Sequence, residues 1–140
     1  NGLTITSTGL AITAPANGLT VTASDAGLVT ARAITDVSAT RANVTNTAGT
    51  PDTTYEVLKY GTWSFGIVNA SLDTNAQANV KLQISPDGAT WKDEAGPVTI
   101  NQNAMDTLVA SIFLKYARVY YNAVNASSAV TLKIYFQGHA

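Results

Sequence analysis

Cysteine is absent from the chain, and histidine occurs once, at His139, one residue before the last. Without cysteine the protein has no disulfide, no thiolate nucleophile and no cysteine-based zinc site. A histidine beside a chain end is seldom held firmly enough to act as a general base, and no second histidine is present to join it in a metal site. We therefore expect no catalytic residues, no metal site and no cofactor, and we do not expect an enzyme.

Charge is also scarce. Charged residues make up 12% of the chain and its net charge is −1, whereas soluble domains carry roughly 25% charged residues. Such a chain lacks the basic patch that attracts nucleic acid or an anionic membrane. It also lacks an apolar run of the roughly 18 residues that a membrane-spanning helix needs. We expect no nucleic-acid partner and no membrane insertion.

Helical periodicity is missing, and the apolar residues alternate with polar ones instead. Val80, Leu82 and Ile84 alternate with polar residues, and a second alternating segment covers residues 131–136. Alternation with a period of two indicates strands that are buried on one face. About seven such strands with turn residues between them predict an all-β domain at residues 55–140, an antiparallel β-sandwich of Ig-like or jelly-roll-like type.

A hairpin turn is predicted within that domain at Pro86, Asp87 and Gly88. Proline is suited to the first central position of a turn, aspartate bonds to nearby backbone, and glycine accepts a positive φ. These residues are assigned a structural role.

The first 36 residues repeat a Gly-Leu-x-Ile/Val-Thr phrase, which predicts a strand-repeat arm. A short strand with a single apolar row needs a neighbour to be stable. The arm therefore either folds back onto its own sheet or pairs with another copy of the protein, as a donor strand or a stalk. The apolar positions that would make either contact are Leu3, Ile5, Leu10, Ile12, Leu19 and Val21.

Between the arm and the sandwich, residues 37–54 are rich in threonine, alanine and asparagine, and turn formers gather at residues 46–52. This segment is interpreted as a linker or an edge strand.

Three motifs of the second half carry a family resemblance: Ser85–Thr90 (SPDGAT), Phe113–Arg118 (FLKYAR) and Leu132–Gln137 (LKIYFQ). With the preceding repeats, the chain resembles an uncharacterised repeat-plus-β-sandwich family of spore-forming Firmicutes, whose members look like SPDG-T, FLKYAR and LTIYFQ. The resemblance implies an extracellular, cell-surface or spore-surface protein. It brings no catalytic residues.

The first functional hypothesis is a structural subunit of an extracellular or spore-surface filament. In it, β-strand addition of the arm to the next subunit builds a homopolymer. The alternative is an adhesin or fibre-tip module on a β-stalk that binds carbohydrate through exposed aromatic residues. The candidate glycan contacts are Trp91, Tyr120 and Tyr121.

Overall fold

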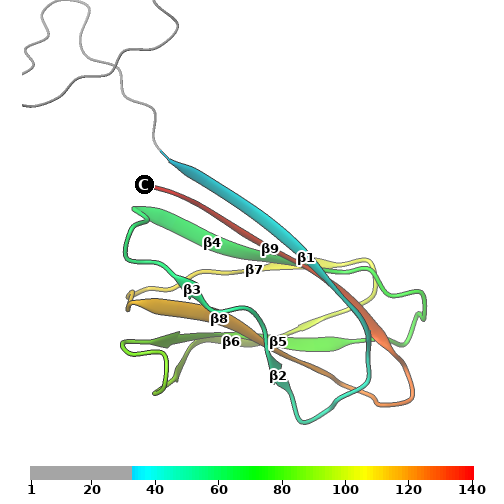
Figure 1. The fold of residues 1–140 in the computed structure, drawn as a ribbon. Helices are drawn as coiled ribbons and strands as arrows, with labels where there is room; N and C mark the ends of the chain where they lie inside the picture. Colours follow the sequence, from blue (N-terminus) through cyan, green and yellow to red (C-terminus); the bar gives the residue numbers. More distant parts are fainter. Residues whose placement is uncertain (1–32) are drawn as a thin grey trace, which may run out of the picture. The chain divides into compact units, whose positions relative to one another are not determined.

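Two antiparallel sheets face each other in the computed structural model, which describes residues 33–140 (Figure 1). Sheet A has the order β1 (Ile34–Val44), β9 (Val130–His139), β4 (Thr62–Asn69) and β7 (Met105–Leu108). Sheet B has the order β2 (Thr50–Pro51), β8 (Tyr116–Ala123), β5 (Ala78–Ser85) and β6 (Lys92–Ile100), and β3 (Tyr55–Glu56) also pairs with β8. The predicted all-β sandwich is confirmed. The six apolar positions of the predicted arm, from Leu3 to Val21, lie outside the described residues.

The core lies between the sheets and is built by alternate residues of the long strands. In β9, Leu132, Ile134 and Phe136 are buried while the residues between them are partly or fully exposed. Phe136 is the centre of an aromatic cluster: the ring of Tyr55 stacks on it at 4.2 Å between centroids, and that of Phe65 lies 5.1 Å away. Aromatic side chains bury more apolar surface than other residues, so this cluster stabilises one end of the sandwich.

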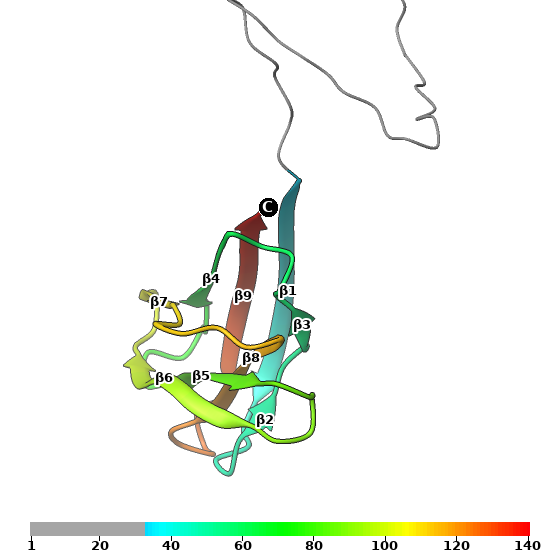
Figure 2. The same cartoon turned by 90° about the vertical axis from the view of Figure 1, so that its left-hand side faces the viewer.

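The first strand of the sandwich begins earlier than the sequence indicates. β1 pairs with β9 from the Ile34–His139 pair onward, so the predicted boundary between residues 36 and 37 falls inside this strand. Because β9 continues to His139, it supplies a partner for residues 34–36 that the local sequence does not reveal. β1 forms one edge of sheet A, and Figure 2 draws it on the same side of the sandwich as β3.

A bulge distorts an edge of sheet B, where β6 pairs with β5. The register shifts between Val80 and Leu82, opposite Gly96, which has a φ of +85°. A bulge increases the local twist of an edge strand and interrupts its ladder. No helix long and apolar enough to cross a membrane is found in residues 33–140.

Candidate functional site

The loop between β5 and β6 positions the first candidate residue. Asp87 Oδ1 accepts hydrogen bonds from the backbone N–H of Ala89 at 2.9 Å and of Thr90 at 2.8 Å. Gly88 has a φ of +78° and donates its N–H to Ser85 Oγ at 2.8 Å. The bonds from Thr90 and Ala89 hold the pKa of Asp87 below its usual value. The loop so formed places Trp91 directly before β6.

Trp91 contacts a cation from β8, which lies on the far side of β5 from β6. The guanidinium carbon of Arg118, on β8, lies 3.9 Å from the centre of the Trp91 ring, which is a cation–π contact. Arg118 Nε also donates a hydrogen bond to Gln83 Oε1 on β5 at 2.9 Å. Burial lowers the pKa of Arg118, but the guanidinium stays charged at neutral pH.

The carboxylate of Asp93, on β6, connects two side chains of β5, Gln83 and Lys81. Asp93 accepts a hydrogen bond from Gln83 Nε2 at 3.0 Å, and its second oxygen lies 3.0 Å from Lys81 Nζ. The hydrogen bond from Gln83, and after it the one from Lys81, lower the pKa of Asp93. Lys81 Nζ in turn lies 5.0 Å from the centre of the Tyr120 ring.

Five side chains from three strands, together with Trp91 from the loop before β6, thus form an unbroken series of contacts on the outer face of sheet B. We call this series the polar ladder: Trp91, Arg118, Gln83, Asp93, Lys81 and Tyr120. It alternates along β5 and β8 with buried residues such as Leu82 and Val119. A small cavity of about 170 Å³ adjoins its Tyr120 end and is lined by Ala48, Asn79, Val80, Lys81, Pro97, Tyr120 and Asn122.

Tyr121 does not belong to this surface, so its assignment as an exposed glycan contact is wrong. It is 8% exposed and packs in the core with Val119 and Ala123. Neighbouring residues of a strand point to opposite faces, so Tyr120 and Tyr121 cannot share one surface. Sequence reasoning placed Lys81 on the polar face of its strand, but it missed the ladder because the pairing of β5 with β8 is non-local.

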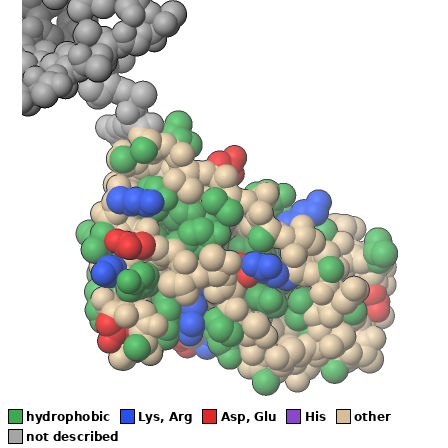
Figure 3. Space-filling model, in the orientation of Figure 1, with side chains coloured by type: hydrophobic (Ala, Val, Ile, Leu, Met, Phe, Trp, Pro, Cys, Tyr) green, Lys and Arg blue, Asp and Glu red, His purple; other side chains and the backbone are tan. Residues whose placement is uncertain are grey.

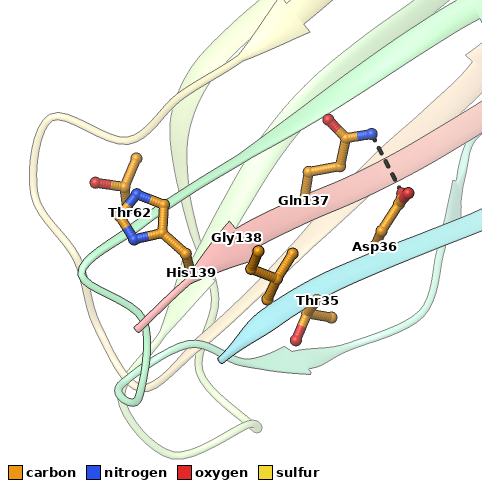
Figure 4. Close-up of a pocket in the computed structure, with 7 residues that line it drawn as sticks. Thr35, Asp36, Thr62, Gln137, Gly138 and His139 are labelled. Atoms are coloured by element: carbon orange, nitrogen blue, oxygen red, sulfur yellow. Dashed lines mark hydrogen bonds between the residues drawn. The ribbon is translucent and has the colours of Figure 1, made fainter. Parts of the chain in front are cut away.

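A larger cavity of about 600 Å³ lies over one end of sheet A (Figure 4). Strands β1, β9 and β4 line it with Ile34, Thr35, Asp36, Thr62, Gln137, Gly138 and His139. Gln137 Nε2 donates a hydrogen bond to Asp36 Oδ1 at 3.2 Å, while Thr62 and His139 stand at the opposite side in Figure 4. Nowhere in residues 33–140 do three or more histidine or acidic side chains gather as metal ligands would.

The free edge of β1 is the remaining candidate surface. Within the part of the chain that the structure describes, β1 has β9 as a sheet neighbour on one side and no strand on the other. Its inward-facing row is tied to the segment between β3 and β4, because Tyr60 Oη donates to Thr35 Oγ1 at 2.7 Å. Val37 lies in the same row and remains 38% exposed. Hydrophobic side chains gather in the area between β1 and β3 in the view of Figure 3.

Comparison with known proteins identifies one solved structure with a similar fold and one protein family. No curated protein matches the chain. The structure of PirA matches 73% of this chain and 94% of its own length, with 17% sequence identity and a TM-score of 0.54. At that identity the likeness concerns the fold alone. Residues 56–140, from β3 to the C-terminal strand, match the family described as a domain of unknown function, DUF6385. The chain therefore belongs to the DUF6385 family, which agrees with the expectation of an uncharacterised family.

Proposed function

We propose that the protein is a structural subunit that assembles by β-strand addition and that the free edge of β1 is the acceptor. The donor is an N-terminal Gly-Leu repeat of another copy. The observation that carries the proposal is the length of the available edge, because β1 runs for 11 residues and pairs with β9 without interruption from Ile34 to Arg41, before a bulge. The unpaired N–H and C=O groups of an edge strand are a template for a further strand.

The inward face of β1 offers apolar contacts to such a donor. Val37 lies opposite Phe136 in the ladder and points to the core side, where Tyr55 stacks on the Phe136 ring. A strand added beside β1 places every second side chain on this side. The leucine and isoleucine of one repeat would cover Val37 and the rim of the aromatic cluster. Burial of each such side chain contributes about 1.5–3 kcal/mol.

The few charges on β1 favour this use of the edge. Natural edge strands avoid pairing by carrying charged residues, proline or bulges. In β1 the charged residues are Asp36 and Arg41, and each is engaged, with Gln137 and Asp52 respectively. Addition of an arm from one subunit to the edge of the next is head-to-tail and does not close, so it builds a filament. We place this filament outside the cell or on the spore surface, as the sequence resemblance implies.

Electron microscopy and light scattering of the purified full chain test the proposal. We expect filaments whose amount rises with protein concentration, and we expect only monomers after deletion of residues 1–26. The deletion leaves every described strand in place, so circular dichroism of the shortened chain should show an unchanged β-spectrum. A full chain that stays monomeric at high concentration, or a shortened chain that still polymerises, contradicts the proposal.

Two substitutions on β1 test the acceptor edge. Val37→Lys places a charge on the inward side, where the donor side chains would pack, and should abolish filaments without unfolding the sandwich. Ser38→Lys is the matched control, because its side chain points to the opposite face, and it should still assemble. If the Val37→Lys variant assembles at the same protein concentration as the wild type, β1 is not the acceptor strand.

A further inference from the structure

We propose that the polar ladder on the outer face of sheet B binds an acidic polysaccharide whose sugar rings carry carboxylates. Trp91 and Tyr120 supply aromatic surface near the two ends of the ladder, and Arg118 supplies the cation that recognises the carboxylate. This site is separate from the β1 edge, since it lies on the other sheet. The inference is therefore independent of filament assembly.

The charges of the ladder select an anionic ligand. Asp93 is paired with Lys81, but Arg118 forms no ion pair with any carboxylate among residues 33–140. Its neighbours are the amide oxygen of Gln83 and the ring of Trp91. The planar guanidinium has five N–H donors and binds a carboxylate through two parallel hydrogen bonds. A stacked guanidinium without a counter-ion is thus preorganised for an external carboxylate.

The shape of the face suits an extended chain rather than a small molecule. The ladder and its adjoining cavity follow five residue-to-residue steps of β5, from Ile84, which pairs with Lys92, to Asn79. At about 3.3 Å per residue this is roughly 17 Å, enough for several sugar rings in a row. The amides of Asn79 and Asn122 line the far cavity and supply donors and acceptors for sugar hydroxyls.

Trp91 supplies the stacking surface of the ladder, because the ring of Tyr120 packs against Gly49 as well as Lys81. Trp91 and Tyr120 are both partly exposed, and each has a cation over its ring. Sugar rings have apolar C–H faces that pack on aromatic rings through the same apolar contacts that aromatic side chains make at interfaces. The combination of a stacking ring and a bidentate cation specifies a uronic acid more closely than a neutral sugar.

Affinity electrophoresis of the full chain in gels that contain polygalacturonate tests the inference. We expect retardation by polygalacturonate, weaker retardation as salt is raised, and none by its fully methyl-esterified form, which has the same backbone without the charge. Trp91→Ala and Arg118→Gln should each weaken binding at least tenfold. Tyr135→Ala is the matched control, because Tyr135 is a partly exposed aromatic residue on the outer face of sheet A, and its binding should equal the wild type.

Thermal unfolding followed by circular dichroism verifies that each variant is folded before binding is compared. Arg118→Gln keeps a hydrogen-bonding side chain beside Gln83 and serves as the folded variant if Trp91→Ala unfolds. Absence of retardation by polygalacturonate overturns the proposal. Equal retardation by the methyl ester, or undiminished binding by folded Arg118→Gln, overturns it as well.

Discussion

Arg41 Nε lies 2.6 Å from Asp52 Oδ1, and this ion pair ties the edge strand β1 to the segment before β3. The Asp52 side chain is 4% exposed, whereas that of Arg41 is 36% exposed. The hydrogen bond that Arg41 donates to Asp52 raises the pKa of Arg41. The pair therefore joins the two layers at the side of the sandwich where β1 has no strand neighbour, and it secures the inward row of the proposed acceptor.

Removal of the cation should destabilise the sandwich more than removal of both charges. Arg41→Ala leaves the buried carboxylate of Asp52 without its partner, and we expect a loss of about 1–3 kcal/mol in the free energy of unfolding. The double variant Arg41→Ala/Asp52→Asn carries no unpaired charge and should recover part of this loss. Urea denaturation of the three proteins measures the difference. Equal stabilities of the single and double variants would show that the buried charge is not the cause.

The buried side-chain amide of Asn69 should contribute as much to the free energy of unfolding as the Arg41–Asp52 ion pair. Asn69 is fully buried, and its Nδ2 donates to the carbonyl oxygens of Ala76 and Ile100, both at 2.9 Å. Its Oδ1 accepts from the backbone N–H and the hydroxyl of Ser71. Asn69→Leu leaves these groups without partners, and we expect a loss of about 3 kcal/mol. Asn79→Leu, at a partly exposed amide of the next strand, should cost less than about 1 kcal/mol in the same urea titration.

Gly96 should not tolerate a side chain. It has a φ of +85°, and a Cβ atom built there would lie 2.8 Å from the carbonyl oxygen of Val80. Gly96→Ala therefore combines backbone strain with a steric clash, and we expect a loss of at least about 2 kcal/mol. For a domain of this size that corresponds to a decrease in Tm of about 8–12 °C. Gly61→Ala is the control, because its nearest contact would be at 3.6 Å, and its Tm should change little.

Stability should decrease in acid, because two aspartates have lowered pKa values. Hydrogen bonds from Thr90 and Ala89 lower the pKa of Asp87, and those from Gln83 and Lys81 lower that of Asp93, from the ordinary value of 3.8. A group whose pKa is lower in the folded state stabilises the protein above its unfolded pKa, and this contribution is lost as pH falls through the folded pKa. Thermal unfolding from pH 6 to pH 2 should therefore show a decrease in Tm below about pH 4.

The double variant Asp87→Asn/Asp93→Asn tests the origin of that decrease. Asparagine keeps an acceptor oxygen at both positions but does not titrate. The variant should have a lower Tm at pH 6 and a shallower decrease toward pH 2. An unchanged pH dependence would assign the acid sensitivity to other carboxylates.

Much of the architecture could be predicted because alternation is a local property. The buried row Val80, Leu82 and Ile84 could be identified from the sequence, and so could the row of Leu132, Ile134 and Phe136. When hydrophobic residues occupy every second position of a strand, they all lie on one face, and that face must be the buried one. The boundary of the sandwich was harder to predict. The residues of the edge strand β1 are mostly exposed, so its sequence carries little of the apolar signal that marks a buried strand.

The sequence by itself determined the all-β class and the buried faces of the long strands, since both follow from the period of the side chains along each strand. Only the tertiary structure decided which strands are neighbours. The pairing of β5 with β8 brings Arg118 beside Gln83 and within reach of Trp91. The same pairing turns Tyr121 inward and leaves Tyr120 outside. Two adjacent tyrosines are alike in hydrophobicity, so their faces are set by the register of β8 in its sheet. Register between distant strands is a property of the whole packed core.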